Sequence, residues 1–191
     1  MTDGDACSAC DALARARSGD AAAFTTLVRR HQRAVYSLAL RMLSDRGKAE
    51  DLAQEVFIRL HGKLALVQSE THLLFWLRQV TSRLAIDRLR RETRYEQLPL
   101  PQDLPLAAES SSGDPLLQQQ LRGLIAQLPA AARAVVLLRY QEDLDPSEIA
   151  QVLEMPVNTV KSHLKRSLER LREQLTGEAA VPAPRTDDAP L

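Results

Sequence analysis

Apolar residues recur at helical spacing along most of this chain of 191 residues. Over residues 48–60 they fall at i, i+1, i+4, i+5 and i+8, and over residues 160–175 they are spaced by four, four, three and four positions. Both spacings stay close to the helical period, so each segment is predicted to form an amphipathic helix. The predicted inward residues are Leu52, Ala53, Val56, Phe57 and Leu60 in the first segment, and Val160, Leu164, Leu168, Leu171 and Leu175 in the second.

Capping residues and helix breakers predict where the helices end. Ser18 or Asp20 is expected to cap the first helix, and Asn158 is the expected cap of the last one. Asp145 is expected to cap a short helix whose first turn contains Pro146, a favoured position for proline. The expected helices cover about residues 20–43, 49–60, 71–91, 116–128, 131–141 and 146–153, followed by the last helix.

Proline placement divides the chain into parts. Four of the ten prolines lie in residues 99–115 and three in residues 182–190, whereas residues 20–98 contain none. The proline-rich stretches lack hydrophobic periodicity, which favours linkers over helices. The sequence therefore predicts an all-α fold of two small helical domains joined by a flexible linker. The parts are a flexible N-terminus (1–19), a first domain (20–95), the linker (96–115), a second domain (116–176) and a disordered tail (177–191).

The composition supports helices and a cytoplasmic location. Aromatic residues make up only 4% of the chain, and β-branched residues are sparse, which disfavours a sheet. No apolar run approaches the length of about 18 residues that a membrane-spanning helix needs, so no membrane insertion is expected. Asp3, Asp5 and Asp11 stand where a signal peptide would carry positive charge. A cytoplasmic protein is therefore expected.

Charged residues are segregated along the chain although the net charge is zero. Residues 21–60, 61–91 and 158–176 carry +3, +4 and +3, whereas residues 92–115 carry −4. Because salt screens charges beyond about 10 Å, a partner experiences these local blocks rather than the total. The balance of charge is therefore compatible with nucleic-acid binding.

Residues 145–172 predict a helix-turn-helix. A short helix, a turn at residues 154–157 and a longer amphipathic helix follow one another, and the small Ala150 suits a close helix crossing. Polar and basic side chains on the outer face of the second helix can reach base edges and phosphates in the major groove. A solvated face of a bundle helix is the alternative, but the coincidence of turn, small residue and basic face favours DNA binding. The candidate contacts are Asn158, Thr159, Lys161, Ser162, His163, Lys165 and Arg166.

Residues 48–60 carry a second candidate surface, opposite their apolar stripe. Asp51, Gln54, Glu55 and Ile58 share this face, and such an acidic strip with one apolar residue suits the docking of a protein. On these residues alone, an ordinary solvated helix face is the favoured interpretation.

Residues 75–91 carry a third candidate surface, with five arginines near Trp76. Contact with single-stranded DNA requires positive charge for the backbone and an aromatic or pocket surface for the bases. The alternatives are core packing of Trp76 and a solvated arginine face.

Cys7 and Cys10 form a Cys-x-x-Cys pair, and the four histidines are isolated from one another. A metal or redox role needs further ligands or a helix N-terminus, so chance is favoured over a regulatory metal or thiol switch. The sequence contains no phosphate loop, nucleophile elbow or metal cluster. We therefore expect neither an enzyme nor a cofactor, and assign no metal site.

In this order, the three segments resemble a bacterial extracytoplasmic-function (ECF, group 4) sigma factor, over residues 20–176. "AEDLAQEVFIRL" resembles the helix of the family's second domain that binds the β′ clamp of RNA polymerase. "WLRQVTSRLAIDRLRR" resembles its −10-reading helix, and "IAQVLEMPVNTVKSHLKRSLERLR" resembles the fourth-domain helix-turn-helix that binds the −35 element. The resemblance implies a sigma factor that binds core polymerase at the β′ clamp and β flap, recognises both promoter elements and promotes DNA melting. It also implies an anti-sigma factor as a partner.

The resemblance also assigns roles to the candidate residues. It makes the strip on residues 48–60 the docking site for core polymerase, against the simpler interpretation given above. The loop at about residues 62–74 would capture a flipped-out base. Arg83 stands where the family commonly has asparagine and His163 where it commonly has arginine, so promoter preference is expected to differ. The implied −10 contacts are Lys63, Trp76, Arg83, Asp87, Arg88, Arg90 and Arg91.

A helix-turn-helix regulator that binds closed duplex DNA without polymerase is the alternative function. Residues 158–171 would fit the output domain of a response regulator nearly as well. The first domain discriminates between the two, because a regulator would carry a receiver or ligand pocket with strands, whereas residues 20–95 predict helices throughout.

Overall fold

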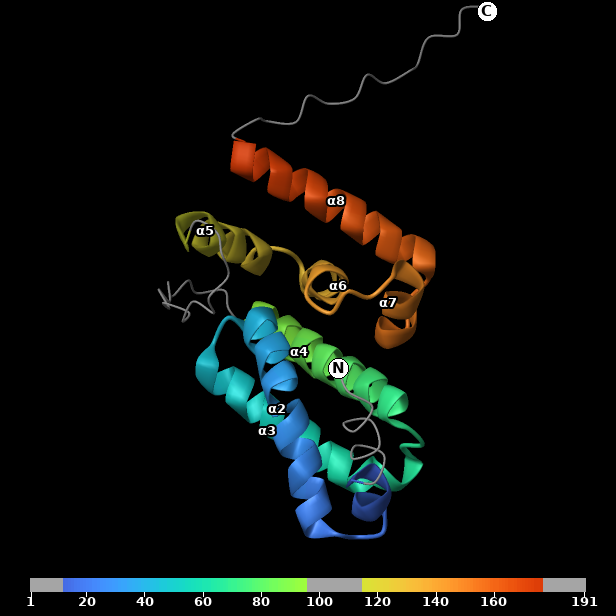
Figure 1. Cartoon of the computed structure of the whole chain (residues 1–191). Coiled ribbons are helices and arrows are strands. Elements are labelled where there is room, and N and C mark those ends of the chain that lie inside the picture. Colours follow the sequence, from blue (N-terminus) through green and yellow to red (C-terminus); the bar gives the residue numbers. More distant parts are fainter. Residues whose placement is uncertain (1–11, 96–114, 177–191) are drawn as a thin grey trace, which may run out of the picture.

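The computed structural model describes residues 12–95 and 115–176, and every regular element within these ranges is helical (Figure 1). The all-α prediction is confirmed for these residues. The cysteine pair, residues 96–114 of the expected linker and the expected tail lie outside the described residues. After a short helix at residues 12–17, the elements are α2 (Ala21–Leu43), α3 (Arg46–Lys63), the 3-10 turn η1 (Leu64–Leu66), α4 (Glu70–Tyr95), α5 (Pro115–Ala126), α6 (Ala130–Tyr140), α7 (Pro146–Leu153) and α8 (Val157–Thr176).

Aspartate caps set the boundaries of the first two long helices. Asp20 accepts hydrogen bonds from the backbone N–H groups of Ala22 and Ala23 at 2.9 and 3.0 Å, as expected for the cap of α2. α3 begins about three residues earlier than predicted, because Asp45 caps it by accepting the N–H of Lys48 at 2.9 Å. Ser44 ends α2 and the next residue, Asp45, caps α3, so the two helices follow one another directly.

α2, α3 and α4 pack together as a first bundle (Figure 1). The stripe predicted for α3 faces its core, since Leu52, Val56 and Leu60 are fully buried. α4 adds Leu73 and Leu77, which are also buried. Most of the stripe predicted for α3 is thus buried, and Ala53 within it is half-buried.

α5 to α8 form a second bundle around α6, which lies between α8 and the first bundle (Figure 1). Every residue of α6 from position 132 to position 138 is buried, including Arg133. A helix that is buried on all sides has to touch more than one neighbour. α6 contacts α8 on one side and both α2 and α4 on the other.

The two bundles therefore pack against each other, which the sequence does not predict. One continuous cluster of buried apolar side chains includes Met42 and Leu77 of the first bundle and Leu138 and Ile149 of the second. The described parts of the two predicted domains share a core rather than facing each other across solvent.

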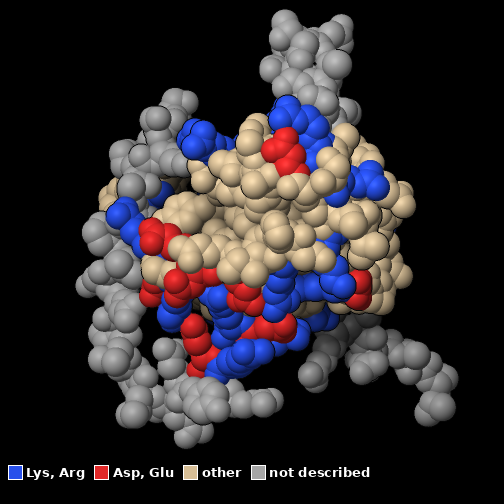
Figure 2. Space-filling view, turned by 90° about the horizontal axis from the view of Figure 1, so that it is seen from below, with Lys and Arg blue, Asp and Glu red and all other residues tan. Residues whose placement is uncertain are grey.

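The charged side chains are unevenly distributed over the surface, although the net charge of the chain is zero. Figure 2 shows a face with a broad area free of charged side chains, bordered mainly by Lys and Arg at the top of the view and by intermixed charges of both signs below. Within the described ranges, no helix is both long and apolar enough to cross a membrane.

Candidate nucleic-acid interface

A capping box holds the start of α7 in the helix-turn-helix. Asp145 Oδ1 accepts the backbone N–H groups of Ser147 and Glu148 at 2.6 and 2.9 Å, and Glu148 Oε2 accepts the N–H of Asp145 at 2.8 Å. These reciprocal bonds satisfy donors at the helix start and confirm the predicted cap. α7 ends at Leu153, and the residue that caps it, Glu154, has a φ of 50° in the left-handed region. The chain therefore reverses within a few residues and starts α8 directly.

The predicted cap of α8 is wrong. The carbonyl of Pro156 accepts the N–H groups of Thr159 at 2.9 Å and Val160 at 3.2 Å, so the helix starts before Asn158. Asn158 lies inside the first turn, where its carbonyl accepts the Oγ–H of Ser162 at 2.8 Å. The physical reason is that the fixed φ of proline suits a helix start and its ring carries no N–H to satisfy.

The outer face of α8 is open to solvent, as a DNA-reading surface requires. His163 is half-buried, and the other candidate contacts are exposed. Lys165 and Glu169 are 3.9 Å apart and both exposed, so their pairing contributes little. The exposed candidates are Asn158, Thr159, Lys161, Ser162, Lys165 and Arg166.

The inner face of α8 differs from the predicted one at two positions. Leu168 and Leu175 are 43% and 38% exposed, while Ser167 is buried between Val160 and Leu171 along the helix. Positions 160, 164, 167 and 171 stay on one side of a helix with about 3.6 residues per turn, whereas position 168 drifts away from it. Helical geometry therefore favours a small polar residue in the core over the next leucine.

Two of the predicted −10 contacts on α4 have intramolecular partners. Arg83 makes an ion pair with Glu154, the residue directly after α7. Arg88 donates to the carbonyl of Lys48 at 2.9 Å and to Oε2 of Glu55 at 2.8 Å, which ties α4 to α3. In this structure, both guanidinium groups are therefore already bound to other groups of the chain.

The remaining −10 candidates are spread over a long stretch. Trp76 is half-buried and packs against the apolar core, in line with the structural alternative given for it. Asp87, Arg90 and Arg91 are exposed on the second half of α4, and Lys63 is exposed at the end of α3. Trp76 and Arg91 are separated by about 22 Å along the helix axis. Single-stranded DNA would therefore have to run along α4 to meet all of them.

The strip on α3 forms one outward surface. Ile58 is 73% exposed, an unusual position for so large an apolar side chain, and Asp51 and Gln54 are also exposed. Glu55 is half-buried, and the hydrogen bond from Arg88 lowers the pKa of its carboxyl, with a further contribution from Arg59. The strip therefore offers a large apolar residue beside the carboxylates of Asp51 and Glu55.

Sequence reasoning missed the residues of the second bundle that reach the first. Glu142 and Glu154 follow α6 and α7, and each pairs with an arginine of α4. Arg133 is buried, and its guanidinium donates to the carbonyls of Met42 and Ala126. The signal in the sequence was Arg133 itself, a single charged residue within the otherwise apolar run at residues 130–138, where a charge needs partners.

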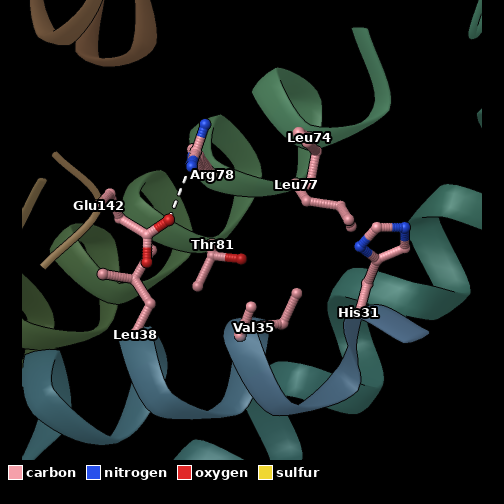
Figure 3. A pocket seen from close by; sticks show the side chains of 9 residues that line it. His31, Val35, Leu38, Leu74, Leu77, Arg78, Thr81 and Glu142 are labelled. Carbon is pink, nitrogen blue, oxygen red and sulfur yellow. Dashed lines mark hydrogen bonds and ion pairs between the residues drawn. The ribbon is translucent and has the colours of Figure 1, made fainter. Parts of the chain in front are cut away.

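A small cavity lies where the two bundles meet (Figure 3). Its volume of about 30 Å³ suits about one water molecule, so it is too small for a cofactor. Buried His31 lines it and lies 3.0 Å from Glu70. Among the described residues, no three His, Cys, Asp or Glu side chains gather as a metal site would require. The lining residues are His31, Ala34, Val35, Leu38, Leu74, Leu77, Arg78, Thr81 and Glu142.

Comparison with known proteins assigns both bundles. Residues 27–95 match the family model of sigma-70 region 2, and residues 118–171 match that of sigma-70 region 4. The ECF RNA polymerase sigma factor SigW of Bacillus subtilis is 32% identical over 183 residues, covering 85% of this chain and 94% of SigW. The ECF RNA polymerase sigma factor SigE of Mycolicibacterium smegmatis is 33% identical over 175 residues, covering 87% of this chain and 68% of SigE.

Solved structures share the fold. The sigma factor RpoE of Bartonella quintana, crystallised with the anti-sigma factor NepR, matches 82% of this chain and 98% of its own, with a TM-score of 0.68 and 21% identity. CnrH, in complex with the cytosolic domain of CnrY, matches 90% of this chain and 99% of its own, with a TM-score of 0.64 and 21% identity. Regions 2 and 4 thus coincide with the two bundles, and the chain belongs to the ECF sigma factors of the sigma-70 family.

Proposed function

We propose that this ECF sigma factor, which directs promoter recognition by RNA polymerase, divides the task among three surfaces: α8 for the −35 duplex, α4 for the unpaired −10 strand and the α3 strip for core polymerase. The protein is not an enzyme, since polymerase makes the phosphodiester bonds. The observation that carries this division is the open, polar and basic outer face of α8 on a capped helix-turn-helix.

The −35 assignment follows from the reach of the side chains on α8. Thr159 and Ser162 are short donors and acceptors for base edges, while Lys161, Lys165 and Arg166 suit phosphates. Each phosphate neutralised by a basic side chain releases counterions, so the affinity for duplex DNA should fall steeply with salt. His163 is half-buried, and its imidazole is shorter than an arginine side chain and has fewer N–H donors, which would weaken phosphate contacts where the family commonly has arginine.

The −10 assignment is supported by the exposed charges at the end of α4. Arg90 and Arg91 are exposed, and Lys63 lies at the end of α3, beside the loop that precedes α4. A single strand held by such charges and stacked on side chains is unavailable for re-pairing. Binding to the unpaired strand would thus drive promoter melting without hydrolysis of a nucleotide.

The docking assignment is supported by the exposure of Ile58 beside Asp51 and Gln54. One large apolar side chain framed by polar groups is typical of an interface anchor with a hydrated rim. We assign this strip to the β′ clamp and expect the second bundle to meet the β flap. Because both core polymerase and promoter DNA are needed, the protein would work in the cytoplasm.

An anti-sigma factor is a further proposed partner. The support is that sigma factors of the same fold have been solved with an anti-sigma factor or with the cytosolic domain of CnrY. Such a partner would hold the chain inactive until a signal releases it.

Run-off transcription tests the proposed function. Fragmented genomic DNA from the source organism would be transcribed by bacterial core polymerase with and without this chain, and the new 5′ ends mapped. We expect discrete starts that share two upstream motifs. Absence of new starts, together with tight duplex binding by the chain alone, would instead favour the regulator that acts without polymerase.

A double variant of α8 sharpens this assay. Lys161→Ala with Arg166→Ala should abolish most new starts, whereas Arg170→Ala, exposed about one turn beyond Arg166 on the same helix, should leave them in place. Equal losses in the two proteins would argue against the assigned face.

A further inference from the structure

The carboxylate of Glu55 lies at the centre of the α3 strip and is held from two sides. Its Oε1 accepts a hydrogen bond from Nη2 of Arg59 at 2.6 Å, and its Oε2 accepts one from Nη2 of Arg88 at 2.8 Å. Arg59 lies one turn further along α3, whereas Arg88 belongs to α4, which packs against α3 (Figure 1). On the helix face of the strip, Glu55 comes one turn after Asp51 and one turn before Ile58. The central side chain of the strip is therefore fixed by an arginine of another helix.

Arg88 reaches Glu55 from a position that is itself fixed. Its Nη1 donates to the backbone carbonyl of Lys48 at 2.9 Å while its Nη2 binds the carboxylate. Because the guanidinium is planar and rigid, two bonds to α3 determine its orientation as well as its distance. The side chains of Arg88 and Glu55 are 26% and 34% exposed, so water and salt screen this pair less than a pair on the open surface.

The held carboxylate can still accept hydrogen bonds from a partner. A carboxylate has about four acceptor positions, and the two arginines use one on each oxygen. A side chain that is already held in one conformation loses little conformational entropy when a partner binds. Glu55 is therefore a preorganised acceptor for N–H donors of a protein surface.

A DNA phosphate is a poorer ligand for Arg88. The structure uses two of the five N–H donors of its guanidinium, so further donors remain. A phosphate placed on them would lie beside the carboxylate of Glu55, and the two negative charges would repel each other. The position of Arg88 thus favours a role on α3 over a role on the strand.

We propose that Arg88 is a positioning residue of the polymerase-docking strip rather than a contact of the −10 strand: together with Arg59 it holds the Glu55 carboxylate in the orientation that core polymerase binds. The matching polymerase surface presents N–H donors to Glu55 and an apolar pocket to Ile58, which is 73% exposed. The inference rests on the proposed docking role of the strip. It leaves Arg90 and Arg91, both exposed, assigned to the strand.

The test compares Arg88→Gln and Arg59→Gln with a control on another helix. Arg41→Gln is the matched control, because Arg41 is exposed on α2, outside the three proposed surfaces. Fluorescence anisotropy of the labelled full-length chain measures its affinity for core polymerase without DNA. A second titration, at saturating core polymerase, measures the binding of a single-stranded oligonucleotide of the mapped −10 region. Circular dichroism checks that the helix content of all proteins is equal.

We expect Arg88→Gln and Arg59→Gln each to weaken core binding about fivefold, the size expected when a held side chain is released and has to be ordered on binding. Strand binding at saturating core should stay unchanged, and Arg41→Gln should match wild type in both titrations. Adding Arg88→Gln to Glu55→Gln should cause no further loss of core affinity, because Arg88 acts through Glu55. A purely structural role of Arg88 would not produce this coupling in core affinity.

Three results would overturn the proposal. Weaker strand binding by Arg88→Gln at saturating core would return Arg88 to the −10 strand. Core binding that neither Arg88→Gln nor Arg59→Gln changes would leave the contact with structure alone, and additive losses with Glu55→Gln would separate Arg88 from Glu55. Because the Arg59 side chain is 52% exposed, Arg59→Gln decides the matter even if Arg88→Gln does not fold. A failure of the proposed function is distinct, since wild type itself would then neither bind core polymerase nor produce discrete starts.

Discussion

α4 and α8 carry similar positive charge, yet the structure treats them differently. The outer face of α8 points its cations to solvent, whereas α4 has two arginines held by carboxylates from another bundle and a third held by α3. The difference teaches that positive charge on a helix does not by itself make an exposed cationic surface, because arginines of α4 are already engaged by carboxylates within the chain.

The largest expected effect comes from a substitution at the contact between the two bundles. Arg133→Met should lower the free energy of unfolding by about 3 kcal/mol, since it leaves buried carbonyls of Met42 and Ala126 without donors. Urea denaturation followed by circular dichroism measures the change. Arg122→Met, at a half-buried position of α5 outside this contact, is the control and should change stability by less than about 1 kcal/mol. Equal effects of the two substitutions would contradict the role given to Arg133.

A second prediction tests the exposed outer face of α8. Lys161→Ala should weaken holoenzyme binding to −35 duplex DNA by about fivefold at all sequences and reduce the salt slope by about one, as expected for the loss of one phosphate contact. Fluorescence anisotropy over a salt series measures both quantities. An unchanged slope would mean that Lys161 does not touch a phosphate.

A third prediction concerns pH at the junction between the bundles. Burial lowers the pKa of His31 although Glu70 opposes this, and Arg30 adds to the lowering, while Arg78 and Glu142 line the same cavity. The unfolded chain therefore takes up a proton more readily than the folded one. The stability from neutral His31 is present above its unfolded pKa of about 6.5 and is lost as pH falls through the lower folded value.

The check is denaturation from pH 7.5 to pH 5.5. Wild type should lose stability on acidification more steeply than His31→Gln, which cannot titrate. Parallel curves for the two proteins would show that His31 is not the group responsible.

The smallest expected effect concerns one exposed pair. Arg83→Asn introduces the residue common in the family and removes the partner of Glu154. Because both side chains are well exposed, the free energy of unfolding should change by only about 0.5 kcal/mol. Thermal unfolding measures it, with Arg90→Asn as an exposed control on the same helix. A loss of several kcal/mol would show that this pair, rather than Arg133, fastens the bundles.

Local features of the fold were predictable because they depend on near neighbours in sequence. The caps Asp20 and Asp145, the buried stripe of α3 and the exposed strip with Ile58 all follow from residues within one or two helical turns. The errors arose where two local signals competed. Asn158 is a good cap in isolation, but Pro156 starts the helix first, and Leu168 is apolar but lies off the line that faces α6.

The sequence alone thus determined an all-α chain with two helical regions, a helix-turn-helix with a basic face and the order of motifs that marks an ECF sigma factor. Only the tertiary structure decided which of the charges are free, because pairs such as Arg78 with Glu142 join residues 64 positions apart. No local periodicity encodes such a pair. It exists because residues 130–138 of α6, apolar except for Arg133, have to be buried against both α8 and the first bundle, and that burial brings the carboxylates onto α4.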